Sequence, residues 1–120
     1  MTALLVLLGG AVGAPLRYLV DLQIQSRHDS VVPWGTFAVN VIGSFVLGVV
    51  AGFVAAHPGH AWVGWLVGTG VCGALTTFST FSYETVRLAQ AGSYAAALLN
   101  IVLSLTSAYA ALALGWRLAF

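Results

Sequence analysis

Four long apolar segments dominate the chain, and polar residues gather in the short stretches between them. The segments cover residues 3–22, 35–56, 62–84 and 94–114. A helix needs roughly 20 apolar residues to cross the hydrocarbon core of a bilayer. Within that core a helix satisfies its own backbone hydrogen bonds, which an isolated strand or loop does not. The pattern therefore predicts an all-α membrane protein with four transmembrane helices and both termini on the same side.

The connections between these segments carry turn and interface signals. Residues 23–30 form a polar stretch, after which Pro33 and Trp34 mark a membrane interface and a helix start. Residues 57–60, His-Pro-Gly-His, have the composition of a turn, and residues 91–93 lead into the last segment. We expect each connection to be short.

The composition leaves no material for a water-soluble domain. Hydrophobic residues make up 60% of the 120 positions and charged residues 6%, whereas soluble domains carry about 25% charged residues. Residues 1–15 superficially resemble a signal peptide, but they lack a basic beginning and are followed by more membrane segments. We interpret residues 1–120 as a single transmembrane domain within a lipid bilayer.

Charge and cysteine content exclude several functions. The charged residues are four arginines, two aspartates and one glutamate, so no basic stripe is available to bind nucleic acid. Cys72 is the only cysteine, which excludes an intrachain disulfide and a cysteine-clustered zinc site. His28, His57 and His60 fall in predicted connections, where a solvated histidine is the simpler interpretation than a metal ligand.

The acidic residues do not form a catalytic set. Asp21, Asp29 and Glu84 lie near segment ends or in a connection. No nucleophile and base can be assembled from them with connection histidines and helix hydroxyls. We expect no enzyme activity.

The third segment contains the most unusual stretch of the chain, residues 68–82, Gly-Thr-Gly-Val-Cys-Gly-Ala-Leu-Thr-Thr-Phe-Ser-Thr-Phe-Ser. Glycines at membrane depth favour a break, and a broken helix frees carbonyl and amide groups that can bind ions. The alternative is a continuous helix whose hydroxyls bond back to their own carbonyls. The density of glycines and hydroxyls favours a break near the middle of this helix.

Amides and hydroxyls mark two further segments. Asn40 lies inside the second segment, where an unpaired amide is costly and a functional role is the first hypothesis. Asn100, Ser104 and Ser107 can share one face of the fourth segment because they are three or four residues apart. The alternative for each is an ordinary hydrogen bond between helices.

Arg17 and several glycines suggest contacts near the helix surfaces. Arg17 either pairs with Asp21, one turn further on, or supplies positive potential at the mouth of an anion path. Glycines four residues apart allow close helix approach, and we expect tight packing for at least one pair. These pairs are Gly9 with Gly13, Gly48 with Gly52, and Gly64 with Gly68.

The same residues form motifs by which the whole chain resembles the small bacterial fluoride channels, the Fluc or CrcB family. The motifs are Gly9-Gly10-x-x-Gly13-Ala14-x-x-Arg17-Tyr18, Gly35-Thr36-Phe37-x-Val39-Asn40-x-x-Gly43-Ser44-Phe45, and Gly70-x-Cys72-Gly73-x-Leu75-Thr76-Thr77-Phe78-Ser79-Thr80-Phe81-Ser82-x-Glu84. The last of these is highly specific.

The resemblance implies an antiparallel, dual-topology dimer of four-helix subunits in the bacterial cytoplasmic (inner) membrane. Two fluoride pores would lie near the subunit interface, and fluoride would leave the cell passively. A structural sodium ion would lie on the two-fold axis, bound by the backbone carbonyls of Gly73 and Thr76. Arg17 corresponds to an arginine of the pore vestibule. The pore residues implied are Asn40, Phe78, Phe81, Ser79, Thr80 and Ser104.

Elementary chemistry is consistent with that resemblance. Fluoride is small and strongly hydrated, so a pore must replace water without trapping the ion. Amide N–H groups, hydroxyls and the positive edge of a phenyl ring do this without a fixed cation.

One position departs from the family pattern, and two alternatives remain open. Some members have a tyrosine where this chain has Asn100, so the resemblance does not assign the path along the fourth helix or the role of Asn100. It assigns no role to Glu84 either. The partner subunit is either an identical chain or a related second polypeptide. The alternative functions are a small multidrug-type exporter, whose first helix needs an acid at membrane depth, and a holin-type protein, whose charged tail is missing here.

Overall fold

The computed structural model of the chain describes residues 1–27 and 34–120. Its four long helical spans are α1 (Thr2–Arg27), α2 (Trp34–Ala56), a composite third span over Pro58–Gln90, and α6 (Tyr94–Ala119). All four are long and apolar enough to cross a membrane. The prediction of an all-helical, multi-pass membrane protein is therefore confirmed. His28, Asp29 and Pro33, which the sequence assigns to a connection, lie outside the described residues.

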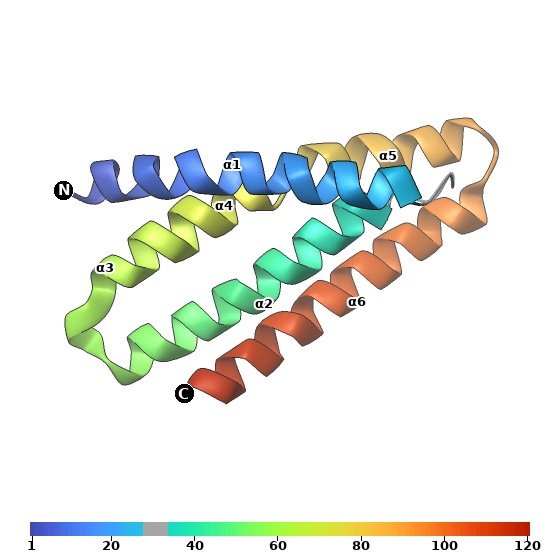
Figure 1. Cartoon of the computed structure of the whole chain (residues 1–120). Helices are drawn as coiled ribbons and strands as arrows, with labels where there is room; N and C mark the ends of the chain where they lie inside the picture. Colours follow the sequence, from blue (N-terminus) through green and yellow to red (C-terminus); the bar gives the residue numbers. More distant parts are fainter. Residues whose placement is uncertain (28–33) are drawn as a thin grey trace.

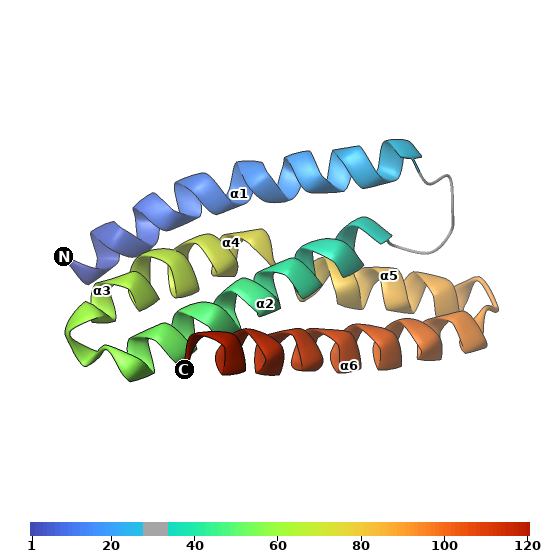
Figure 2. The same ribbon diagram turned by 60° about the horizontal axis from the view of Figure 1, so that its bottom comes forward.

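The spans form an elongated bundle of 51 × 27 × 22 Å with both termini at one end (Figure 1). The helix α2 runs beside α6, and α1 covers the other side of the third span (Figure 2). Many large apolar side chains remain exposed on the outside of the bundle. Such a surface requires a lipid or protein environment rather than water.

Glycines allow two of these pairs of helices to touch through their backbones. A Cβ atom at Gly48 would overlap the carbonyl of Leu112 on α6, and one at Gly115 would overlap the carbonyl of Phe45 on α2. The expected close packing is confirmed here, because lipid-embedded helices associate by van der Waals contact rather than by hydrophobicity.

The first helix meets the third span in the same way. Gly9 lies directly against Gly70, and Gly13 lies against the backbone of Val71. The pair Gly64 and Gly68 makes only ordinary van der Waals contacts. Two of the three predicted glycine pairs therefore bring backbones together.

The third span is assembled from several short elements. A 3₁₀ turn (η1, Pro58–His60) leads into α3 (Ala61–Val63), a π-helical segment (η2, Gly64–Cys72) and α4 (Gly73–Leu75). The helix α5 (Ser79–Gln90) completes the span. Residues 76–78 between α4 and α5 are not helical, and Thr76 has extended backbone angles of φ −82° and ψ 159°.

The sequence predicts a break in the third helix, whereas the structure has a bend and not two separate spans. The span changes direction by 24°. The wide π-helical turns were not predicted, because the apolar pattern of α- and π-helices is too similar over nine residues.

Three predicted helix ends were wrong by several residues. The helix α1 continues to Arg27 rather than ending at residue 22, α5 continues to Gln90, and α6 continues to Ala119. Loss of hydrophobicity marks where a helix leaves the hydrocarbon, but it does not stop the helix. Stopping requires a signal such as proline or glycine.

One such signal closes α5. The N–H of Ser93 donates to the carbonyl of Leu88, and that of Gly92 donates to Ala89. Gly92 has φ +84°, a left-handed angle that glycine adopts without strain. This C-terminal cap reverses the chain into α6 within three residues.

Candidate functional site

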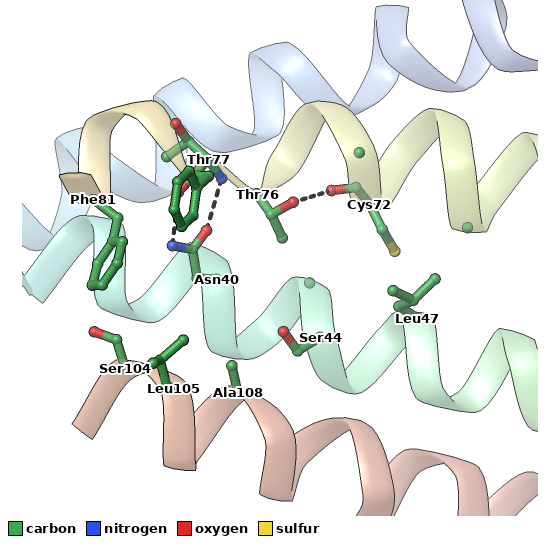
Figure 3. Close-up of a pocket in the computed structure, with 14 residues that line it drawn as sticks. Asn40, Ser44, Leu47, Cys72, Thr76, Thr77, Phe81, Ser104, Leu105 and Ala108 are labelled. Atoms are coloured by element: carbon green, nitrogen blue, oxygen red, sulfur yellow. Dashed lines mark hydrogen bonds between the residues drawn. The ribbon is translucent and has the colours of Figure 1, made fainter. Parts of the chain in front are cut away.

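Asn40 on α2 clamps the non-helical residues of the third span. Its Nδ2 donates to the carbonyl of Thr77 at 2.9 Å, and its Oδ1 accepts from the N–H of Thr77 at 2.7 Å (Figure 3). The side-chain amide thus pairs with one backbone residue as a neighbouring strand would. One N–H of Nδ2 remains for another acceptor.

This clamp redirects the amides that would otherwise close the helix. In a continuous α-helix the carbonyl of Gly73 pairs with the N–H of Thr77, and that of Thr76 pairs with Thr80. Here Thr77 donates to Asn40, and Thr80 donates to Oγ1 of Thr77 at 3.2 Å. The carbonyls of Gly73 and Thr76 therefore lose their usual i+4 partners, which makes them available to a cation.

Arg17 approaches one of these carbonyls. Its Nη1 lies 3.5 Å from the carbonyl oxygen of Thr76, the outer limit of a hydrogen bond. Asp21, the partner that the sequence offered for Arg17, packs over Gly35 at the start of α2 and borders a cavity together with Arg17. Arg17 thus brings positive charge beside the interruption.

A cavity of about 290 Å³ opens beside the clamp (Figure 3). Its wall includes Asn40, Thr76, Thr77, Phe78, Phe81 and Ser104, from α2, the third span and α6. No charged residue lines this cavity in the part of the chain that the structure describes. The cavity offers amide and hydroxyl groups between apolar walls.

The two phenylalanines of this wall differ in burial. Their ring centroids are 5.8 Å apart with planes inclined at 47°. Phe81 is 9% exposed, whereas Phe78 is 76% exposed and stands at the rim. Phe81 is therefore held within the chain, whereas the ring of Phe78 lies on its surface.

A second cavity of about 200 Å³ also borders the non-helical part of the third span, at Thr77. Arg17, Asp21, Thr36, Thr77 and Thr80 line it. Thr77 lines both cavities, so the two have the residue that Asn40 holds in common. Ser79 lines neither cavity, although its hydroxyl is 3.3 Å from Oγ1 of Thr77.

Asn100 lies behind the wall of the first cavity rather than in it. Oδ1 of Asn100 accepts a hydrogen bond from Ser104 at 3.4 Å, and Nδ2 donates to Oγ1 of Thr85 on α5 at 2.9 Å. The contact between Asn100 and Ser104 confirms that they share a helix face. Asn100 itself borders a separate apolar hollow with Trp34 and Leu88.

Glu84 forms a polar contact between α5 and α2 that the sequence did not indicate. Its Oε1 accepts from the hydroxyl of Thr36 at 2.9 Å. Its Oε2 is buried without a hydrogen-bond partner among the residues described here. The sequence by itself assigned no role to Glu84 and none to Thr36.

Thr77 is the site residue that sequence reasoning most clearly missed. It stands in the Thr76-Thr77 pair of the noted motif, but nothing in a single sequence distinguishes these two threonines. Their difference is tertiary: Thr76 bonds back to the Cys72 carbonyl at 2.8 Å, whereas Thr77 is held by Asn40.

Comparison with known proteins agrees with these features. The family described as "CrcB-like protein, Camphor Resistance (CrcB)" matches residues 4–116. A protein of Frankia casuarinae named Fluoride-specific ion channel FluC 1 is 55% identical, and the match covers 99% of this chain and 96% of that protein. A FluC 1 protein of Streptomyces avermitilis is 58% identical over 81% of this chain and 80% of its own length. A FluC protein of Shewanella woodyi is 44% identical over 98% and 94%.

Proposed function

The chain belongs to the CrcB-like family, which comprises ion channels rather than enzymes, and from this premise we propose that it is a fluoride-selective channel. Fluoride crosses passively and leaves the cytosol, which protects the cell from fluoride that enters as neutral HF. The membrane is the bacterial cytoplasmic (inner) membrane. The relatives' names refer to fluoride conduction.

The observation that carries the proposal is the fixed amide of Asn40 at an uncharged cavity. Both of its polar atoms are bound to Thr77, so the remaining N–H is held in a defined direction. A donor that is already oriented binds an anion without a further ordering cost. Because no cation lines the cavity among the described residues, the anion is not held too tightly to leave.

The pore combines this amide with the ring edge of Phe81, the more exposed Phe78 and the hydroxyl of Ser104, all in the same wall. The edge of a phenyl ring carries the positive part of its quadrupole. The second cavity, which Arg17, Thr77 and Thr80 line, serves as the vestibule. Arg17 raises the local fluoride concentration there.

Sodium is the structural cation of the proposal. The freed carbonyl oxygens of Gly73 and Thr76 form the hard donor set that such a cation prefers. When bound, sodium would add positive potential beside the interruption. Arg17, which contacts the Thr76 carbonyl, is the chain's own positive charge at that position.

An antiparallel dimer completes the proposed pore. Phe78 is 76% exposed at the cavity rim, and a Cβ at Gly73, which borders the same cavity, would meet nothing within the chain. A second subunit that covers this face would bury that aromatic ring at the rim of the cavity. The partner is a second copy of the chain, or a related subunit where the host encodes one.

Fluoride efflux from liposomes tests the proposal. The purified chain is reconstituted in vesicles loaded with potassium fluoride, and a fluoride electrode records release after valinomycin is added. We expect rapid release of fluoride and little release of chloride under the same conditions. Proton-coupled transport of a quaternary ammonium dye, without fluoride release, would instead identify a multidrug-type exporter.

A further inference from the structure

Three hydrogen bonds in series connect the cavity wall to the backbone of Phe81. Ser104 Oγ donates to Asn100 Oδ1 at 3.4 Å, Asn100 Nδ2 donates to Thr85 Oγ1 at 2.9 Å, and Thr85 Oγ1 donates to the Phe81 carbonyl at 2.8 Å. Asn100 and Ser104 are 9% and 8% exposed. The series is therefore shielded from competing solvent.

The chemistry of Thr85 sets the direction of the whole series. A threonine hydroxyl has one proton, and Thr85 gives it to the Phe81 carbonyl, which can only accept. Thr85 must therefore accept from its other neighbour, so the NH₂ group of Asn100 faces it. The amide oxygen of Asn100 then faces Ser104.

This orientation determines what Ser104 presents to the cavity. Ser104 has one proton, and the amide oxygen of Asn100 takes it. With the proton so engaged, the hydroxyl offers only lone pairs to the cavity, and lone pairs repel an anion. Ser104 can donate to an anion only after it releases Asn100.

We propose that Asn100 is a positioning residue that competes with the permeating anion for the hydroxyl proton of Ser104, and that Thr85 fixes Asn100 in the orientation required for this. The inference rests on the proposed fluoride conduction. At 3.4 Å the bond between Ser104 and Asn100 is long, so it exchanges readily for one to fluoride. The exchange weakens fluoride binding at Ser104 and speeds the ion's departure.

Two variants release the Ser104 proton. Asn100→Leu removes the acceptor while keeping the side-chain size, and it adjoins an apolar hollow of about 100 Å³ lined by Trp34 and Leu88. Thr85→Val removes the group that fixes the amide, so the NH₂ of Asn100 can turn toward Ser104. Thr106→Val is the matched control, because Thr106 also bonds back to its own helix, at 2.6 Å to Val102, on an exposed face of α6.

The first measurement is fluoride efflux from liposomes as a function of fluoride concentration. For Asn100→Leu and Thr85→Val we expect the half-saturating concentration to fall by about twofold to tenfold, the range that one neutral hydrogen bond corresponds to. Thr106→Val should leave it unchanged. Adding either substitution to Ser104→Ala should produce no further shift. Equal shifts with and without the Ser104 hydroxyl, or no shift at all, overturn the proposal.

A second measurement does not need a conducting Ser104 variant. Asn40 and Asn100 are the only asparagines, so ¹⁵N-asparagine labelling gives two side-chain amides in the NMR spectrum of the reconstituted protein. Fluoride, but not chloride, should shift the Asn100 amide in the wild-type protein and leave it unshifted in Ser104→Ala. A shift that persists in Ser104→Ala overturns the proposal. Wild-type protein that passes no fluoride overturns the proposed function as well, which distinguishes the two failures.

Discussion

The side-chain amide of Asn40 and the backbone of Thr77 form two reciprocal hydrogen bonds, of 2.9 and 2.7 Å, across 37 residues of sequence. This pair joins α2 to the non-helical residues 76–78 of the third span. The same amide borders the larger cavity. The side chain of Asn40 therefore both holds the third span and is a candidate ligand for the anion.

Asn40→Asp tests both roles with little change in size. The carboxylate still accepts from Thr77 N–H but now faces the Thr77 carbonyl without a donor. We expect stability to fall by about 1–3 kcal/mol, the cost of a buried unpaired acceptor, and fluoride efflux to be lost because of the added negative charge. Thermal unfolding in detergent and liposome efflux measure the two effects. Ser44→Ala, in the same cavity wall, is the control, and wild-type efflux by Asn40→Asp would contradict the assignment of Asn40.

Phe78→Ile and Phe81→Ile test the ring edges. Both substitutions keep apolar bulk but remove the polarised edge, so we expect each to cut efflux by more than about tenfold, ~1.4 kcal/mol. Because Phe81 is 9% exposed and Phe78 76%, only Phe81→Ile should lower subunit stability, by about 1 kcal/mol. Phe78→Met should retain more transport, since its thioether is polarisable. Size-exclusion chromatography reports assembly. If both isoleucine variants assemble and conduct normally, the phenylalanines serve packing alone.

Gly43 and Thr76 provide a suppressor test of the packing at the bend. A Cβ at Gly43 would overlap the Cγ2 methyl of Thr76, so Gly43→Ala should destabilise by about 1–3 kcal/mol. Thr76→Ser removes that methyl and keeps the hydroxyl bond to Cys72, so it should restore most of the loss. Gly48→Ala is the control, because it meets the backbone of Leu112, which no side-chain change relieves. Equal rescue of both alanine variants would show that the contact is not specific.

Gly73→Val tests the open space beside Gly73, which borders the larger cavity. A Cβ at Gly73 meets nothing within the chain, whereas one at Gly70 meets the backbone of Gly9. We therefore expect Gly73→Val to fold as a subunit but to lose dimerisation and efflux, and Gly70→Val to lose folding itself. Circular dichroism with chemical crosslinking separates these outcomes. Dimeric, conducting Gly73→Val protein would remove both the interface and the sodium site from this face.

Removal of sodium tests the cation directly. Protein exchanged into N-methylglucamine buffer should lose fluoride efflux, and millimolar sodium should restore it, because backbone carbonyls bind a hard cation reversibly. Potassium at the same concentration should restore it less well. Undiminished efflux after exhaustive exchange would contradict the sodium site and leave Arg17 as the cationic group at the Thr76 carbonyl.

Reporter fusions at Phe120 test the antiparallel arrangement. With four spans, Arg17, Arg27 and Arg87 would face one side of the membrane and Arg117 the other. Three arginines against one is only a weak bias under the positive-inside rule. Both orientations should therefore be detected in cells that express only this chain. A single orientation would contradict a homodimer and leave a related second subunit as the partner.

The apolar pattern by itself determined the class, the number of spans and the common side of the termini. Hydrophobic length is a property of each segment alone, and lipid leaves an isolated apolar segment little choice but a helix. The same pattern misplaced the ends at Arg27, Gln90 and Ala119, because a helix continues into polar sequence until a backbone signal stops it.

Only the tertiary structure decided how the polar residues are used. Asn40 and Asn100 are equivalent in sequence terms, yet one binds backbone at the bend and the other binds Ser104 and Thr85 behind the cavity wall. Phe78 and Phe81 likewise differ in burial although they are only three residues apart. A hydrogen-bond partner 37 residues away is chosen by how glycine-lined helices fit together. That fit depends on all four spans at once, which is why local sequence does not contain it.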